Sequence, residues 1–233
     1  MSDGPAAAPV RVWDLPLRIF HWALALCVFG AIACAKIGGN AMPWHGRFGL
    51  AVLGLLVFRL AWGFIGSTHA RFADFVRGPA TIRAYLRGEW QGEGHNPLGA
   101  LSVLAMLGTL LLLAATGPFA NDDIAFEGPL YALVGKALSD RISSVHHFFE
   151  PVILLLVALH LAAIAYYVLH RKETLIRPMI TGRRQGRGPS ATGGGTAAFL
   201  VALALALAAV YAASGAWLAE PVTPPAAGTT PAF

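Results

Sequence analysis

Charged residues are scarce in this chain of 233 residues. Asp, Glu, Lys and Arg make up only 12% of it, about half the roughly 25% that is usual in soluble domains. Hydrophobic residues make up 56%, and the mean hydropathy is +0.61. So few charges cannot cover the surface of a globular protein, which excludes soluble, disordered, collagen-like and disulfide-scaffold proteins. The composition predicts an integral membrane protein, and the net charge of +5 then indicates basic loops rather than a surface for nucleic acid.

Cysteine is scarce as well. Cys27 and Cys34 are seven residues apart in one apolar stretch, which on a helix is about 10 Å. A disulfide requires Cα atoms within about 7 Å, so the two cannot bond to each other. No Cys-x-x-Cys-His motif occurs, which excludes a covalently attached c-type haem. We expect both cysteines to be packing residues.

Apolar runs near the roughly 20 residues needed to cross a bilayer occur five times. They lie at 17–36, 45–66, 98–118, 146–169 and 197–217. The first run has no cationic region ahead of a short apolar core, so we do not expect it to be a removable signal peptide. The sequence therefore predicts five transmembrane helices in the lipid bilayer.

The orientation of these helices follows from the loops that carry Lys and Arg. The N-terminus and the segments 67–97 and 170–196 hold twelve of them, whereas the opposite side holds four. Basic residues concentrate on the cytoplasmic side, so the N-terminus is expected to be cytoplasmic and the C-terminus external. We divide the chain into a cytoplasmic N-terminus (1–15), a four-helix domain (16–182), a Gly/Arg-rich linker (183–196), a fifth transmembrane helix (197–218) and an external Pro/Ala/Thr tail (219–233).

Five of the eight histidines lie in or at the ends of the predicted spans. They are His21, His45, His146, His147 and His160. Ionisable residues in hydrocarbon are costly and mark function by default, although a neutral histidine bonded to a backbone carbonyl explains any single one equally well. His146 and His160 are fourteen residues apart, so they share a helix face within about 40° and are separated by about 21 Å. His147 lies about 140° from that face, but a helix that begins late would exchange the two neighbours.

The predicted topology pairs these histidines across helices. His21 lies opposite His160 in the inner half of the membrane, and His45 lies opposite His146 in the outer half. Haem iron accepts an imidazole on each side of its plane, whereas zinc would require further ligands and these spans offer only Glu150. The pairs predict two b-type haems. Filled axial positions favour electron transfer over chemistry at iron.

Arginine inside the second span supports this interpretation. Arg59 follows His45 by fourteen residues on the same face, and a buried Arg is expensive unless it meets an anion. We expect that anion to be a propionate of the inner haem. Arg18 and Arg47 could serve in the same way or extend to the interface. Small residues of the second span would let either a macrocycle or another helix approach, namely Gly46, Gly49 and Gly54.

Several motifs together resemble the bacterial cytochrome b561 and nickel–iron hydrogenase b-type cytochrome family. The resemblance covers roughly residues 11–182. It rests on Val-Trp-Asp-Leu-Pro at 12–16, Arg-Ile-Phe-His-Trp at 18–22, His-Gly-Arg-Phe-Gly at 45–49, Arg59 with Trp-Gly-Phe at 62–64, His-Ala-Arg-Phe at 69–72, Gly-His-Asn-Pro-Leu-Gly at 94–99, and the His146…His160 span.

The resemblance implies an all-α fold: an integral membrane four-helix bundle that binds two haems b, here with one extra C-terminal transmembrane helix. Its haem ligands fall on His21, His45, His146 and His160, and the third span contributes none. His147 departs from the family, which often has an acidic residue there. The resemblance also implies the bacterial cytoplasmic (inner) membrane.

The expected function is electron transport in a respiratory chain, between a quinone or quinol and a redox partner. By the resemblance, that partner is a hydrogenase-type subunit or a c-type cytochrome. The alternative is a stand-alone membrane oxidoreductase that oxidises superoxide or quinol near a haem edge. A transporter or proton channel using the same histidines would be colourless.

The sequence leaves the roles of three further side chains open. His69 and His95 flank an amphipathic loop segment, where they could contact protons or quinone near the inner haem or simply cap the loops. Glu150 lies one turn from His146 and could bond that imidazole, relay protons or extend to water.

Overall fold

The computed structural model describes residues 8–89, 96–186 and 189–218. Within these ranges, five helices are long and apolar enough to cross a membrane. They are α1 (Leu15–Ile37), α2 (Met42–Ile65), α5 (Pro97–Thr116), α6 (Tyr131–Leu169) and α8 (Gly195–Ala213). The five predicted spans and the all-α class are therefore confirmed.

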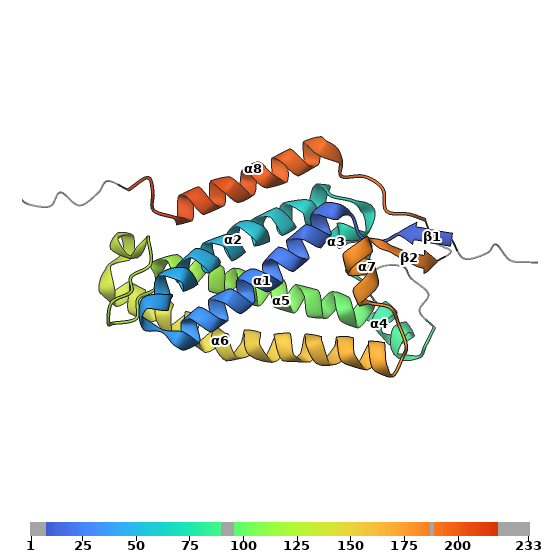
Figure 1. Ribbon diagram of the computed structural model, residues 1–233, viewed down its shortest axis with the longest axis horizontal. Coiled ribbons are helices and arrows are strands. Elements are labelled where there is room, and N and C mark those ends of the chain that lie inside the picture. The colour runs from blue at the N-terminus through green and yellow to red at the C-terminus, as the bar shows by residue number, and fades with distance from the viewer. Residues whose placement is uncertain (1–7, 90–95, 187–188, 219–233) are drawn as a thin grey trace, which may run out of the picture.

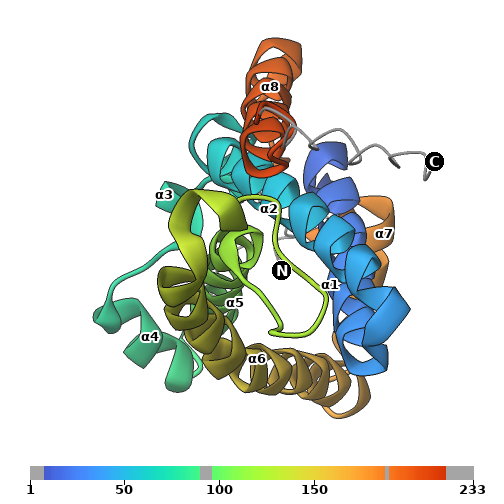
Figure 2. The same ribbon diagram turned by 90° about the vertical axis from the view of Figure 1, so that its left-hand side faces the viewer.

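Four of these helices form a bundle, and the fifth lies outside it (Figure 1). Neighbouring helices pack in the order α1–α2–α5–α6, and α8 packs on α2. The end-on view in Figure 2 shows α1, α2, α5 and α6 around a common centre, with α8 on the far side of α2. This is the predicted four-helix bundle with one extra helix.

The two ends of the bundle differ in what they carry. We call one end of the bundle the turn end. There the 3₁₀ turn η1 (Gly39–Ala41) joins α1 to α2, and the α5–α6 loop begins with η3 (Gly117–Phe119). Gly38 has a φ of 69°, which suits glycine and ends α1 there. The other end, here the sheet end, holds the start of α1 and a small sheet.

At the sheet end, Asp14 caps α1. Its Oδ1 accepts a hydrogen bond of 2.7 Å from the backbone N–H of Leu17, and Pro16 occupies the first turn. Asn96 caps α5 in the same way, through the N–H of Gly99 at 2.7 Å.

The two-stranded sheet was not expected. β1 (Ala8–Arg11) pairs antiparallel with β2 (Arg183–Gly186), inside the segment predicted as a linker. After β2, Thr192 accepts a 2.8 Å bond from the N–H of Thr68, and Gly193 bridges to Ser67. The start of the predicted linker thus pairs as a strand with the N-terminal segment. Its end forms backbone contacts with the residues just after α2.

Helix α6 begins fifteen residues earlier than the predicted fourth span, at Tyr131 rather than 146, and bends at Gly135 (φ 69°). The added turns mix apolar residues with Lys136, Ser139, Asp140 and Arg141, so a search for continuous apolar runs misses them. Their partner is Asn121 of the α5–α6 loop, whose Nδ2 donates to Ser139 Oγ at 2.7 Å and to Asp140 Oδ1 at 3.0 Å. The backbone N–H of Asn121 donates to Ser143 Oγ at 2.9 Å.

The segment between α2 and α5 folds into short helices at the sheet end. They are η2 (Thr68–Ala70), α3 (Phe72–Phe75) and α4 (Pro79–Leu86), and α7 (Ile176–Thr181) follows α6. Trp22 Nε1 donates to the Met179 carbonyl at 3.2 Å, which holds α7 against α1. Trp90 and His95 of the predicted amphipathic segment lie outside the described residues.

Close packing of α8 explains one of the span-two glycines. A Cβ added at Gly54 would lie 2.6 Å from Val210 Cγ2 of α8, so only glycine permits this approach. Nearby, Phe199 packs edge-on against Phe58 and Trp62, with ring centroids 5.8 and 6.4 Å apart. Gly54 is therefore a helix contact, whereas a Cβ at Gly49 would have nothing within 4 Å.

Candidate functional site

A cavity of about 400 Å³ opens inside the turn end of the bundle. Its walls come from α1, α2, α5, α6 and the α5–α6 loop, and they are mostly apolar. Figure 2 looks onto this end and shows the α5–α6 loop crossing in front of the bundle centre. The polar side chains in the lining are Lys36, His45, Asn121, Asp122, His146, His147 and Glu150.

Two histidines face each other across this cavity. The ring centroids of His45 on α2 and His146 on α6 are 6.1 Å apart, and the ring planes are inclined by 80°. Two imidazoles bound on opposite sides of one metal ion, each at about 2 Å, would place their centroids about 6 Å apart. The pair therefore has the separation that a shared metal ion between them requires.

Hydrogen bonds fix which ring nitrogen each histidine can offer. His45 Nδ1 lies 3.0 Å from the Ala31 carbonyl of α1, which only accepts, so Nδ1 carries the proton and Nε2 the lone pair. His146 Nδ1 lies 3.0 Å from Thr116 Oγ1. The Thr116 hydroxyl already donates to the Leu112 carbonyl at 2.8 Å, so it accepts from His146. Both imidazoles are thus oriented with Nε2 available for a ligand bond.

The space between the rings suits a flat group. Gly49 lines the cavity and a Cβ there would meet nothing within 4 Å. Gly46 also lines it, with the Phe126 ring 3.2 Å from where its Cβ would stand. The donor set, its spacing and this apolar lining fit haem b. Within the described ranges, no three His, Cys, Asp or Glu come together as a zinc site would need.

His147, the alternative to His146, lies beside the pair. Its ring is perpendicular to that of His146 at 6.2 Å, and its side chain is exposed. It also lines the cavity. The ring contact with His45 is made by His146.

At the sheet end, His21 and His160 are half-buried and interact electrostatically. His21 Nδ1 is buried with no hydrogen-bond partner among the described residues, and the Trp22 ring stands edge-on to it at 5.1 Å. A buried polar nitrogen without a partner costs about 1–3 kcal/mol, so this imidazole keeps the capacity to bind a group from outside the chain.

Arg59 is 2% exposed and lies near the sheet end. Its guanidinium stacks over Phe72 at 4.8 Å and Phe75 at 5.8 Å, and it interacts electrostatically with Asp14. Its Nη1 is buried with no partner among the described residues. The guanidinium forms no ion pair within 4 Å among the described residues, so its buried Nη1 remains able to donate to an anion from outside the chain.

Asp14 was not singled out in the sequence as a charge partner. Besides capping α1, it accepts from Trp62 Nε1 at 2.9 Å and from the Ser67 hydroxyl. It thereby joins the start of α1 to the end of α2, beside Arg59. An Asp two residues before a proline at the start of an apolar run signals an N-cap, but nothing in the sequence signals its distant partners Trp62 and Ser67. Thr116 was missed because it belongs to the third span, which was expected to supply no ligand.

The remaining predicted polar residues differ in whether the chain supplies a partner. Arg18 Nη1 donates to the Ile180 carbonyl, although its Nε is buried without a partner in the described part of the chain. Arg47 stacks on Trp44 at 4.6 Å. Glu150 forms an ion pair with Lys36 of α1, a partner that none of its sequence-based readings included. His69 Nε2 is buried without a partner among the described residues.

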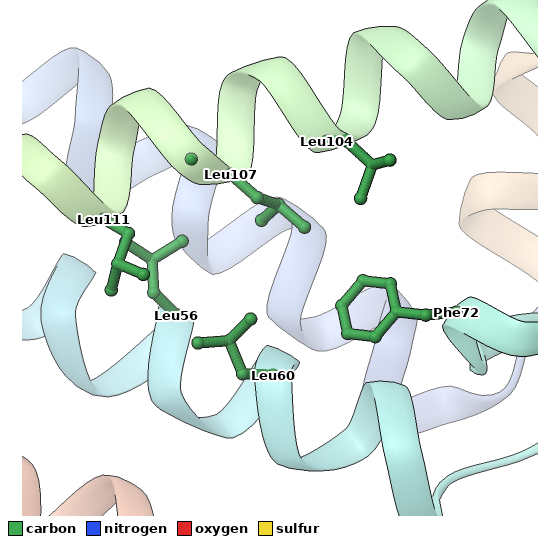
Figure 3. A pocket seen from close by; sticks show the side chains of 7 residues that line it. Leu56, Leu60, Phe72, Leu104, Leu107 and Leu111 are labelled. Atoms are coloured by element: carbon green, nitrogen blue, oxygen red, sulfur yellow. The ribbon is translucent and has the colours of Figure 1, made fainter. Parts of the chain in front are cut away.

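A second cavity, of about 190 Å³, lies between α2 and α5 (Figure 3). Phe72 and five leucines point into it, namely Leu56, Leu60, Leu104, Leu107 and Leu111, and Gly108 completes the lining. None of these described residues has a polar side chain. It offers no ligand atom and is not a candidate site for a metal.

Known proteins with similar sequences agree with this chemistry. The sequence model of the family described as prokaryotic cytochrome b561 matches residues 12–182, which ends before α8. A probable Ni/Fe-hydrogenase B-type cytochrome subunit of Rhizobium leguminosarum bv. viciae is 25% identical over 214 residues, covering 75% of this chain and 88% of the relative. A protein of the same description from Azotobacter chroococcum mcd 1 is 24% identical over 216 residues, with the same coverage. The chain belongs to the prokaryotic cytochrome b561 family and is a multi-pass b-type cytochrome for electron transfer across the membrane.

Proposed function

We propose that the chain holds two haems b, one at the turn end between His45 and His146 and one at the sheet end between His21 and His160. It passes electrons between a quinone or quinol and a redox partner, a hydrogenase-type subunit or a c-type cytochrome. The observation that carries the proposal is the facing pair His45 and His146, 6.1 Å apart with both Nδ1 protons already engaged. His45 and His146 would together hold the haem iron, which would then supply one-electron transfer rather than chemistry on a bound substrate.

The chain's own residues orient the ligands and balance charge. The Ala31 carbonyl and the Thr116 hydroxyl hold the two turn-end rings in one tautomer, and such supporting bonds typically change metal affinity by about 10- to 100-fold. At the sheet end, the free Nη1 of Arg59 is the donor for a haem propionate, with Arg18 Nε as a second. When bound, each haem would supply a one-electron iron couple.

The sheet end is the cytoplasmic side in this proposal. The basic residues of the N-terminus and of segments 67–97 and 170–196 support it, because such residues concentrate on the cytoplasmic side of bacterial membranes. The cytochrome domain is then 16–182, and α8 is an added span with an external tail. Electrons would then cross the bilayer by passing between two haems, one near each membrane face.

Transmembrane electron transfer in proteoliposomes tests this function. With dithionite outside and ferricyanide trapped inside, the wild-type chain should reduce the ferricyanide well above the rate of protein-free liposomes. His21→Ala and His45→Ala should each lower that rate at least about tenfold, because either loss leaves one haem and a gap across the bilayer. Rapid mixing of the detergent-solubilised protein with a quinol should show reduction of the haem spectrum.

His170→Ala is the matched control, since His170 is exposed at the end of α6 and should leave the rate unchanged. Wild-type transfer by His45→Ala protein would refute the two-haem path. Failure of any quinol to reduce the haems would refute the quinone part. Catalytic turnover without a partner would instead identify a self-sufficient oxidoreductase.

A further inference from the structure

One ion pair stands at the wall of the turn-end cavity. Lys36 Nζ, in the last turn of α1, contacts Glu150 Oε1 on α6, one turn beyond His146. Both residues line the cavity. Their side chains are 62% and 35% exposed, and pairs this exposed contribute only about 0–1 kcal/mol. Lys36 can therefore leave Glu150 for another anion at little cost in free energy.

The charges around this cavity are unbalanced for an anionic ligand. Among the described residues that line it, Lys36 is the one Lys or Arg, whereas Asp122 and Glu150 are both acidic. Asp122 is already engaged, because its Oδ1 accepts from the backbone N–H groups of Ile124, Ala125 and Phe126 at 2.8–2.9 Å. These bonds hold the pKa of the Asp122 carboxyl below its usual value. Glu150 is thus the acid that holds Lys36.

Haem b carries two carboxylates and requires a cation where they come to lie. At the sheet end the free donor of Arg59 meets that requirement, but no arginine of the described residues lines the turn-end cavity. We propose that Lys36 is the counter-ion for a carboxylate of the turn-end haem, and that Glu150 holds Lys36 in place until that carboxylate replaces it. This inference rests on the proposed turn-end haem site.

The competing explanation is that the pair is only a latch between α1 and α6. Substitutions distinguish the two explanations. If the pair only joins α1 to α6, replacing either residue breaks the ion pair and should have the same effect. As a counter-ion, Lys36 should matter only for a haem with free carboxylates, and removing the charge of Glu150 should release Lys36 for the haem. The two explanations therefore predict opposite signs for Glu150.

The experiment titrates haem-free full-length protein, in a His21→Ala background that leaves only the turn-end site, with haemin or with haemin dimethyl ester. The Soret band reports the dissociation constant. Lys36→Gln should weaken haemin binding about tenfold or more, as expected for a lost charge-assisted bond, and leave ester binding within about twofold. Glu150→Gln should bind haemin at least as tightly as the parent. Lys136→Gln is the control: Lys136 is 61% exposed, pairs with Asp123 and Asp140, and does not line the cavity.

Three outcomes would overturn the inference: unchanged haemin affinity in Lys36→Gln, equal weakening of haemin and its ester, or equal weakening by the Lys36 and Glu150 substitutions. Failure of the proposed function looks different. In that case the His21→Ala parent itself would bind no haem with two nitrogen ligands, before Lys36 is altered.

Discussion

Replacing His146 with alanine should remove one haem from each chain and leave the other in place. The ring of His146 faces His45 at 6.1 Å, and its Nδ1 is hydrogen-bonded to Thr116. The haem content, measured as pyridine haemochrome per polypeptide, should fall by half. A redox titration should lose one of two components. His45→Ala should give the same result, because it removes the other proposed ligand of the same iron.

The adjacent histidine gives a matched control. His147→Ala should keep both haems, since its exposed ring lies perpendicular to His146 rather than opposite His45. If His147→Ala lost a haem while His146→Ala kept both, His147 rather than His146 would be the ligand. Retention of both haems in each variant would contradict ligation at this position.

Replacing Asp14 with alanine should lower the free energy of unfolding by about 2–4 kcal/mol. The substitution removes a helix cap, worth about 0.5–2 kcal/mol, together with the bonds from Trp62 and Ser67. It also removes the carboxylate that interacts with Arg59, which is 2% exposed. The Trp62 indole N–H and the Ser67 hydroxyl would be left buried without this acceptor, which typically costs about 1–3 kcal/mol for each group. Denaturant unfolding in detergent, followed by the haem spectrum and by circular dichroism, measures the change.

Asp74→Ala provides the comparison for this prediction. Asp74 pairs with Arg71 at 2.7 Å, but both side chains are partly exposed, so the change should stay below about 1 kcal/mol. Asp14→Asn should fall between the two, since the amide oxygen can still cap α1 while the charge is lost. An Asp14→Ala protein no less stable than Asp74→Ala would show that this buried contact does not hold the sheet end together.

The spans and the turn-end histidine pair could be predicted from the sequence because both depend on local regularities. A run of about 20 apolar residues has few alternatives in a bilayer. Helical phase and matched depth then bring His45 towards His146, and the structure places their rings together. The same reasoning could not separate the uses of the span-two glycines. Gly54 and Gly49 look alike in the sequence, yet one contacts α8 and the other borders the cavity.

Features built from distant polar partners could not be predicted. The pairing of Val10 with Arg184 depends on where the whole bundle brings the two ends of the chain. The early start of α6 depends on Asn121, whose loop supplies the partners that lipid cannot. Thr116 supports His146 from a helix that has no charged residue and no histidine. In each case the sequence shows one partner, and only the tertiary fold supplies the other.

The haem content of the oxidised full-length protein, together with its electron paramagnetic resonance spectrum, tests the central claim most directly. The proposal of two haems, each bound by two histidines, predicts about two haems b per chain, both low-spin as expected for iron with two imidazole ligands. A colourless protein, a single haem per chain, or high-spin iron with an open axial position would contradict it.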